Sequence, residues 1–227
     1  MLILGIETSG KTASCAVYDS EKKSVRGEFT VKTEKMQSQI ILPMCEKLLE
    51  ETELELSDID SFAVSKGPGS YTGIRIGISA VKAITYSLNK KCCGVSELFA
   101  LAVRTNVENG IVCSIIKARQ NLVYCAVYKN PLGKCEEIFS ECITESENLD
   151  GFLRNLNENI ILTGPDSAEF ADKYKNEKYK PADVLCREQN AVSLCRAAEI
   201  IGFYDADKLD ASYLQLTEAE RNLKNKE

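Results

Sequence analysis

An internal repeat constrains the fold of this chain more than any other feature. Residues 2–18 (LILGIETSGKTASCAVY) align without a gap on residues 112–128 (VCSIIKARQNLVYCAVY), and both copies end in the tetrapeptide Cys-Ala-Val-Tyr. Each copy consists of an apolar run, a short polar turn and a second apolar run, which is the pattern of a β-hairpin. The repeat predicts a chain of two related halves, each of which opens with a hairpin.

The remainder of each half alternates predicted strands and helices. The first half has a helix over residues 36–51 with Pro43 inside it, a single turn at 57–59, a strand at 62–65 and a second helix at about 73–88. The second half has a strand at 160–163 and helices near 168–174 and 191–201. This alternation predicts an α/β protein.

We expect the chain to divide into three parts. Residues 1–104 form the first lobe, residues 105–212 form a second lobe that duplicates it, and residues 213–227 form a C-terminal tail helix. Each lobe should contain a mixed sheet flanked by helices.

Composition excludes several functions. The 28 Lys and Arg residues against 34 Asp and Glu residues give a formal net charge of −6, which argues against a main phosphate-neutralising surface for nucleic acid. Histidine is absent, so no Ser-His, Cys-His or histidine-ligated mechanism is available to this chain alone. We expect no catalytic residue, no cofactor and no resident metal.

The ten cysteines lack a CxxC pair, and the vicinal pair Cys92-Cys93 does not match the spacing of zinc sites, so we interpret most thiols as small core residues. The start MLILGIETS lacks the features of a signal peptide, and no run of about 18 apolar residues indicates a membrane span. We expect a reduced, cytoplasmic protein without a membrane partner.

The glycine-rich stretch SKGPGSYTGIRIG at residues 65–77 follows an apolar run. Its spacing matches neither GxGxxG nor a P-loop. A loop that leads into a helix still exposes backbone N–H groups to an anion, so the weak candidates for a phosphate contact are Glu7, Gly67, Gly69 and Thr72. The favoured alternative is that Ser70 and Thr72 are helix caps.

The helix after this stretch carries small residues on one face. Gly73, Gly77 and Ala80 recur at helical spacing and would allow another helix to come close. The alternative is a core helix that is covered on all sides by its own lobe. Arg75 on this helix either pairs with an acid of its own chain or binds a phosphate or a partner carboxylate.

Two lobes that each begin with a hairpin resemble the actin, Hsp70 and sugar kinase ATPases, in which the paired turns hold nucleotide phosphates. In that superfamily the first turn carries an acidic residue beside the magnesium-phosphate unit, and Glu7 stands there in this sequence. The ungapped repeat makes Lys117 its counterpart, and a lysine cannot coordinate magnesium. Residual anion binding at Lys117 and Arg119 remains open.

The motifs GIETSGKTASCAVYD, QSQIILPMCEKLL, SKGPGSYTGIRIGISAVKAI, GVSELFALA and SYLQ with a following AER resemble the bacterial TsaB family. The resemblance covers essentially the whole chain and is tightest over residues 2–103. Three positions depart from the usual pattern: Gln37 replaces a frequent histidine, Lys117 a frequent aspartate and Gln215 a frequent arginine. Each change removes a group that could serve chemistry.

The resemblance implies a non-catalytic scaffold and activator. TsaB-like proteins pair with the catalytic paralogue TsaD, which transfers a threonylcarbamoyl group to the adenosine beside the anticodon of tRNA; a TsaE-like ATPase joins them, and tRNA is reached only through the complex. With helix periodicity, the resemblance implies these partner-binding residues, which would also serve a homodimer: Gln37, Ile41, Met44, Ile74, Arg75, Gly77 and Ala80. The alternatives are a free-standing actin-like ATPase or phosphotransferase, and a metallopeptidase, which the lack of histidine disfavours.

Overall fold

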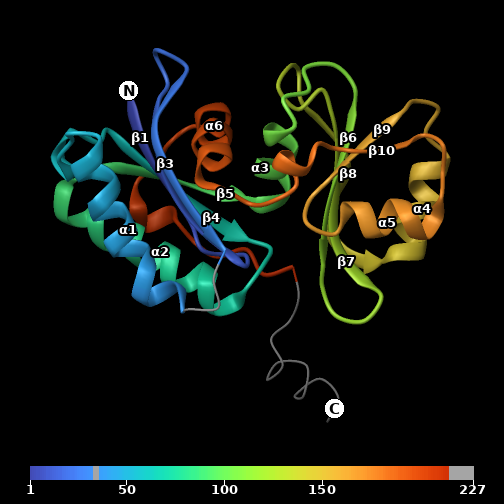
Figure 1. Cartoon of the computed structure of the whole chain (residues 1–227), viewed down its shortest axis with the longest axis horizontal. Helices are drawn as coiled ribbons and strands as arrows, with labels where there is room; N and C mark the ends of the chain where they lie inside the picture. The colour runs from blue at the N-terminus through green and yellow to red at the C-terminus, as the bar shows by residue number, and fades with distance from the viewer. Residues whose placement is uncertain (33–35, 215–227) are drawn as a thin grey trace, which may run out of the picture.

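The computed structural model describes residues 1–32 and 36–214, which form two lobes, each built on a five-stranded sheet (Figure 1). The first sheet has the order β3-β2-β1-β4-β5. Its strands are β1 (Leu2–Glu7), β2 (Thr12–Asp19), β3 (Ser24–Lys32), β4 (Ser61–Gly67) and β5 (Lys91–Ser96). The second sheet repeats the arrangement as β10-β9-β6-β7-β8. Its strands are β6 (Ile111–Lys117), β7 (Leu122–Lys129), β8 (Glu136–Glu145), β9 (Ile160–Thr163) and β10 (Tyr179–Pro181).

Six α-helices of the described residues cover the faces of the two sheets. They are α1 (Gln37–Glu51), α2 (Tyr71–Leu88), α3 (Glu97–Arg104), α4 (Ser146–Arg154), α5 (Ser167–Tyr174) and α6 (Ala191–Ile201). Single 3-10 turns lie at Leu56–Asp58, Val184–Cys186 and Ala206–Lys208. Both predicted hairpins, the helices α1, α2, α5 and α6, and the strands β4 and β9 are confirmed. Residues 215–227, most of the predicted tail helix, lie outside the described residues.

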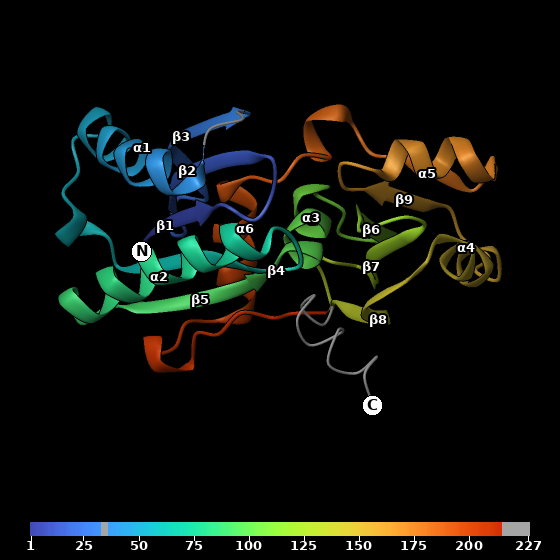
Figure 2. The ribbon, with the colours of Figure 1, turned by 90° about the horizontal axis from the view of Figure 1, so that it is seen from below.

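The elements stack in five layers. Helices α1 and α2 cover the outer face of the first sheet, α6 and α3 lie between the sheets, and α4 and α5 cover the outer face of the second sheet (Figures 1 and 2). Alternate residues of each central strand therefore enter different cores. This also accounts for the vicinal thiols, because Cys92 enters the outer core and Cys93 enters the core between the sheets.

The two central helices exchange lobes. Helix α3 follows the first sheet in the chain but packs on β6 and β7, whereas α6 follows the second sheet and packs on β1, β2, β4 and β5. Helix α3 was not predicted, because the predicted boundary between the lobes, after residue 104, falls where this helix ends. Its residues 98–103 are all buried, so the segment is the centre of the interlobe core rather than a linker.

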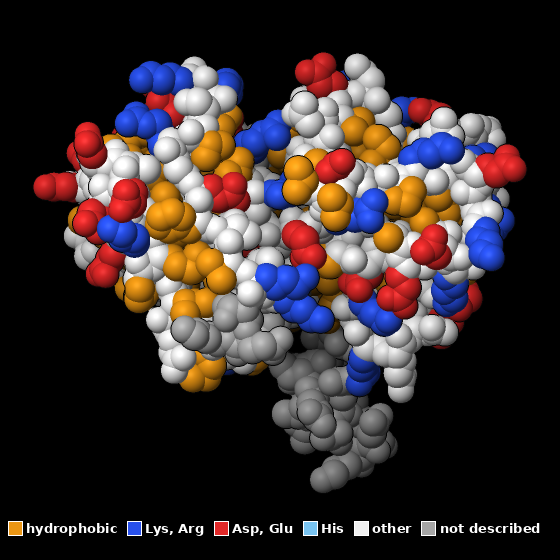
Figure 3. Space-filling model, viewed as in Figure 1, with side chains coloured by type: hydrophobic (Ala, Val, Ile, Leu, Met, Phe, Trp, Pro, Cys, Tyr) orange, Lys and Arg blue, Asp and Glu red, His pale blue; other side chains and the backbone are white. Residues whose placement is uncertain are grey.

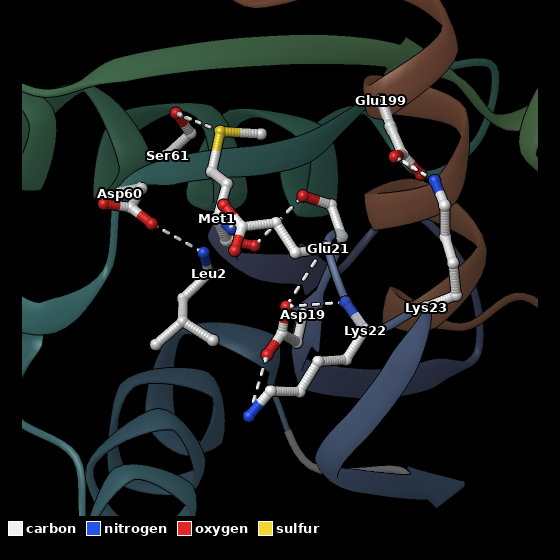
Figure 4. Close-up of polar contacts among 10 residues, drawn as sticks. Met1, Leu2, Asp19, Glu21, Lys22, Lys23, Asp60, Ser61 and Glu199 are labelled. Carbon is white, nitrogen blue, oxygen red and sulfur yellow. Dashed lines mark hydrogen bonds and ion pairs between the residues drawn. The ribbon is translucent and has the colours of Figure 1, made fainter.

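The end of the chain also returns to the first lobe. Lys23 in the β2–β3 turn forms an ion pair with Glu199 of α6 (Figure 4). Tyr204 then pairs with Cys92 of β5 through two backbone hydrogen bonds of 2.9 Å. The division of the chain at residue 104 stays a prediction, but residues 191–212, which the sequence assigns to the second lobe, pack on the first.

The strand registers correct the ungapped repeat. The tetrapeptides of β2 and β7 correspond, yet Ser14 pairs with Glu7 whereas its counterpart Tyr124 pairs with Ile116. The residue that corresponds to Glu7 is therefore Ile116, and the expectation of Lys117 was wrong by one position. Between these pairs the second hairpin has one residue more than the first (117–123 against 8–13), and an ungapped alignment cannot show that.

The shift matters because side chains alternate across a strand. Glu7 and Ile116 both face the space between the sheets, where α3 and α6 lie. Two residues before Glu7 and Ile116 lie Gly5 and Ser114, which also correspond to each other. Helix α6 crosses the first sheet at Gly5, and α3 crosses the second sheet at Ser114. A Cβ atom at Gly5 would lie 2.5 Å from the Ala191 carbonyl oxygen of α6. In the second lobe Ser114 instead donates a 2.6 Å hydrogen bond to the Leu98 carbonyl oxygen of α3.

We predict that Gly5→Ala destabilises the protein by about 1–3 kcal/mol, because the added methyl group must push α6 away from the first sheet. Gly151→Ala is the control: a methyl group added to this α4 glycine would meet no atom within 4 Å, so the change should stabilise the helix by up to about 1 kcal/mol. Urea unfolding followed by circular dichroism measures both. Equal effects of the two substitutions would contradict the close approach of α6.

Candidate functional site

The outer helices of the first lobe present an apolar surface to solvent. Four large side chains are exposed by at least two fifths of their area: Met36, Leu42, Tyr71 and Tyr86. They lie on α1, on α2 or at the residue that precedes α1, and hydrophobic side chains gather over this region in Figure 3. We call this surface the α1–α2 face. Exposed Tyr and Met side chains are enriched where proteins meet one another.

The predicted partner-binding residues divide into two groups. Ile41, Ile74 and Gly77 are buried in the core of the first lobe, so their assignment to a partner-contacting surface is corrected: they pack α1 and α2 on their own sheet. Arg75 is exposed, and Met44 and Ala80 are partly exposed.

Gln37 serves the first lobe itself. Its side-chain amide donates to the backbone carbonyl oxygens of Gly10 and Thr12, at 3.4 and 3.3 Å. The side chain therefore ties the start of α1 to the first hairpin turn, and it is only partly available to another protein.

The glycines of residues 65–77 allow α2 to cross the first hairpin turn closely. Added Cβ atoms would lie 2.4 Å from the Ser9 carbonyl oxygen at Gly69, 2.0 Å from the Thr8 carbonyl oxygen at Gly73 and 2.6 Å from Thr8 Oγ1 at Gly77. Gly73 and Gly77 therefore form a joint within the lobe, but α2 is not the fully covered core helix of the alternative, because Arg75 and Tyr86 on it are exposed.

Ser70 is the N-cap of α2, and its hydroxyl accepts from the Gly73 amide at 3.2 Å. Its own amide donates to the Ser9 carbonyl oxygen at 2.7 Å. Gly67 has a φ of 106°, which is the left-handed region that favours glycine. Thr72 is exposed in the first turn of α2 and makes no cap. The capping interpretation is thus confirmed for Ser70 and wrong for Thr72.

A cleft of about 810 Å³ separates the two hairpin turns. Its cationic lining comes from both lobes: Lys11, Lys32, Lys117 and Arg119. Two of these side chains form ion pairs with acids of this chain: Lys32 with Glu188 at 3.1 Å and Lys117 with Glu169 at 2.8 Å. Lys11 and Arg119 form no ion pair with an acid in the described part of the chain.

Beneath the cleft, Glu7 and Glu97 form a fully buried pair of carboxyl groups. Glu7 ends β1 and Glu97 begins α3, so the pair joins the first hairpin to the exchanged helix. Glu7 Oε1 accepts hydrogen bonds from the Ser9 amide at 2.5 Å and from the Ser9 hydroxyl at 2.6 Å. Glu7 Oε2 and both carboxyl oxygens of Glu97 have no donor among the described residues.

The contact between the two carboxyl groups requires a proton. Burial raises the pKa of Glu97, and the neighbouring Glu7 raises it further, while Ser65 and Gln189 oppose part of this rise. Burial also raises the pKa of Glu7, and the hydrogen bonds that Ser9 donates limit that rise. Two adjacent buried carboxylates cannot both ionise cheaply, so burial and mutual repulsion favour a pair that keeps one proton. Glu7 is thus enclosed and turned away from solvent, which does not suit a ligand of magnesium in the cleft.

The comparisons with known proteins agree with this architecture. The protein-family model described as "TsaD: tRNA N6-adenosine threonylcarbamoyltransferase" matches residues 20–194. A protein named "tRNA threonylcarbamoyladenosine biosynthesis protein TsaB" from Bacillus subtilis is 29% identical over 74% of this chain and 72% of its own length. The protein of the same name from Buchnera aphidicola (subsp. Schizaphis graminum) is 31% identical over 89% of this chain and 92% of its own length.

A solved structure, "YeaZ from Pseudomonas aeruginosa", superimposes with a TM-score of 0.77 over 94% of this chain and 99% of that chain, at 23% identity. The paired five-stranded sheets, the duplicated hairpins and the interlobe cleft define a two-lobed protein of the actin-like ATPase fold. Within that class, the chain belongs to the TsaB family.

Two further features are absent from the described part of the chain. No group of three or more His, Cys, Asp or Glu side chains in residues 1–32 and 36–214 could hold a metal ion. Over the same residues, no helix has the length and apolar character needed to cross a membrane.

We predict that Glu97→Gln stabilises the protein at pH 8 and has little effect near pH 5. The folded chain holds the shared proton more tightly than the unfolded chain does, so stability falls as pH rises from the unfolded glutamate pKa of about 4.3 through the raised folded pKa. The loss is about 1.4 kcal/mol for each pKa unit, and a glutamine avoids it while donating to Glu7 Oε2.

Urea unfolding between pH 5 and pH 8 tests this prediction. Glu177→Gln is the control, because Glu177 is exposed and should leave the pH profile unchanged. A Glu97→Gln profile parallel to that of the wild type would show that no proton is shared at this site.

Proposed function

We propose that this chain is a non-catalytic scaffold and activator in tRNA threonylcarbamoyladenosine biosynthesis, and that it pairs with a TsaD-like catalytic paralogue. The observation that carries the proposal is the α1–α2 face, where large apolar side chains are exposed on two adjacent helices. The assignment to tRNA threonylcarbamoyladenosine biosynthesis is based on the names of the relatives from Bacillus subtilis and Buchnera aphidicola.

The interlobe cleft supports a role without chemistry of its own. Lys32 and Lys117 are neutralised by acids, and Glu7 is buried against Glu97 beneath the cleft. The sequence contains no histidine to hold a catalytic metal. The TsaD-like partner would supply the transferase site in this arrangement.

We propose the remaining partners from the net charge and from the resemblance to the TsaB family. A net charge of −6 disfavours direct binding of tRNA, so we propose that tRNA is reached only through the complex. A TsaE-like ATPase would complete the assembly in the cytoplasm. In the absence of the paralogue, the α1–α2 face would serve a homodimer of this chain.

We predict that Leu42→Asp abolishes pairing with the TsaD-like protein of the same organism and leaves the fold intact, because Leu42 is 46% exposed on α1. Leu185→Asp is the matched control, since Leu185 is 75% exposed on the second lobe and should not matter. Co-purification measures pairing, and a tRNA modification assay with and without this chain measures activation. Normal pairing by Leu42→Asp would exclude the α1–α2 face.

We also predict that the isolated chain binds Mg-ATP no more tightly than about 1 mM. There are two reasons: Glu7 is buried and is not available to magnesium, and Lys117 is already paired with Glu169. Isothermal titration calorimetry tests this. Tight magnesium-dependent binding with turnover of ATP would instead favour a free-standing actin-like ATPase that uses Lys11 and Arg119.

A further inference from the structure

Tyr71, Arg75 and Tyr213 form an exposed cluster at the start of α2, which we call the Tyr–Arg cluster. The guanidinium carbon of Arg75 lies 4.1 Å from the centroid of the Tyr71 ring and 5.9 Å from that of the Tyr213 ring. The two rings are 4.9 Å apart. Arg75 Nε donates a 3.0 Å hydrogen bond to the Tyr213 hydroxyl. Three contacts thus fix the orientation of one arginine fork on the surface.

Tyr213 reaches α2 because the preceding segment is attached to the first lobe. The Ser212 amide donates to the Lys66 carbonyl oxygen at 2.8 Å, and Asp210 lies 3.4 Å from Lys82 of α2. Residues 210–213 therefore run beside β4 and α2, and this path places the Tyr213 ring next to Arg75. The cluster joins residues that are 138 positions apart in the chain.

Within residues 1–32 and 36–214, the Nη groups of the Arg75 guanidinium have no recorded hydrogen-bond acceptor. The groups that influence Arg75 are the hydroxyl and ring of Tyr213 and the ring of Tyr71, and none of the described residues places a carboxylate against it. Nε is occupied, so the terminal Nη groups remain for an external acceptor. This is unexpected in a chain that has 34 acidic residues against 28 basic ones. The expectation that Arg75 pairs with an acid of its own chain was wrong within the described residues.

The surroundings favour a protein over a nucleic acid. Ser79 and Ala83 lie one and two turns along the exposed side of α2, where small side chains allow close approach. Ile76 and Met36 line a groove of about 550 Å³ between the starts of α1 and α2. Two lysines also line it, Lys11 and Lys32, and Lys32 is paired with Glu188. An arginine flanked by tyrosines and apolar groups is the usual composition of an interface hot spot. A phosphate backbone would need a row of cations, whereas the nearby Lys82 already faces Asp210.

We propose that the Tyr–Arg cluster receives an Asp or Glu side chain of the partner protein. The two free Nη groups can bind both oxygens of a carboxylate, and the tyrosine rings hold the fork in place, so little side-chain entropy is lost on binding. The proposal rests on the function proposed above and adds the chemistry by which the α1–α2 face selects its partner. The cluster would then orient the partner at the end of the face nearest the interlobe cleft.

The test compares Arg75→Lys and Arg75→Glu by calorimetric titration of the full chain with the TsaD-like protein of the same organism. Lysine keeps the charge but loses the fork, so affinity should fall about 10-fold; glutamate should weaken binding by roughly 30-fold or more. Tyr213→Phe keeps the ring and loses the hydroxyl, which should give a smaller loss. Thermal unfolding should not change for any variant, because all three groups are exposed.

Lys134→Glu is the control for net charge, since Lys134 is exposed on the second lobe. Unchanged affinity for Arg75→Glu, with loss of pairing for Leu42→Asp, would overturn the carboxylate contact and leave the proposed function standing. Absence of pairing by the wild-type chain would overturn both. Loss of binding to a short tRNA anticodon stem by Arg75→Glu, with pairing intact, would assign the cluster to RNA phosphate and overturn the proposal.

Discussion

The exchange of α3 and α6 between the lobes is the constraint on which the rest of the structure depends. Each helix follows one sheet in the chain and packs on the other, so the two lobes share a single interlobe core. The approach is close enough that Gly5 has no room for a side chain beneath α6, while Ser114 binds the α3 backbone directly. Neither lobe can bury its inner face without the other. The same packing sets the distance between the two hairpin turns, and therefore the shape of the cleft between them.

The site features follow from the same core. Helix α3 begins with Glu97, and its position between the sheets brings that carboxyl group against Glu7 beneath the cleft. This fully buried carboxyl pair lies at the place where an actin-like ATPase would use an acid beside magnesium, and here it belongs to the packing between the lobes. The surface that we propose for the partner lies on the outer layer, where α1 and α2 expose apolar groups and the Tyr–Arg cluster.

Sequence reasoning predicted local structure well and contacts between distant segments poorly. The repeat predicted both hairpins, and helical periodicity predicted α1, α2, α5 and α6, because these patterns depend on residues close in the chain. The ungapped alignment paired Glu7 with Lys117, because one extra turn residue leaves no mark in an apolar pattern. Ile41, Ile74 and Gly77 were predicted to face a partner, yet burial depends on which sheet covers them.

The sequence by itself determined two related α/β halves, the hairpin that opens each, the family resemblance and the lack of any histidine chemistry. Only the tertiary structure decided that α3 and α6 change lobes, that Glu7 meets Glu97, and that Tyr213 holds Arg75. The physical reason is separation along the chain. Periodicity reports which side of an element is apolar, but the partner of that side is chosen by packing among segments that lie about a hundred residues apart.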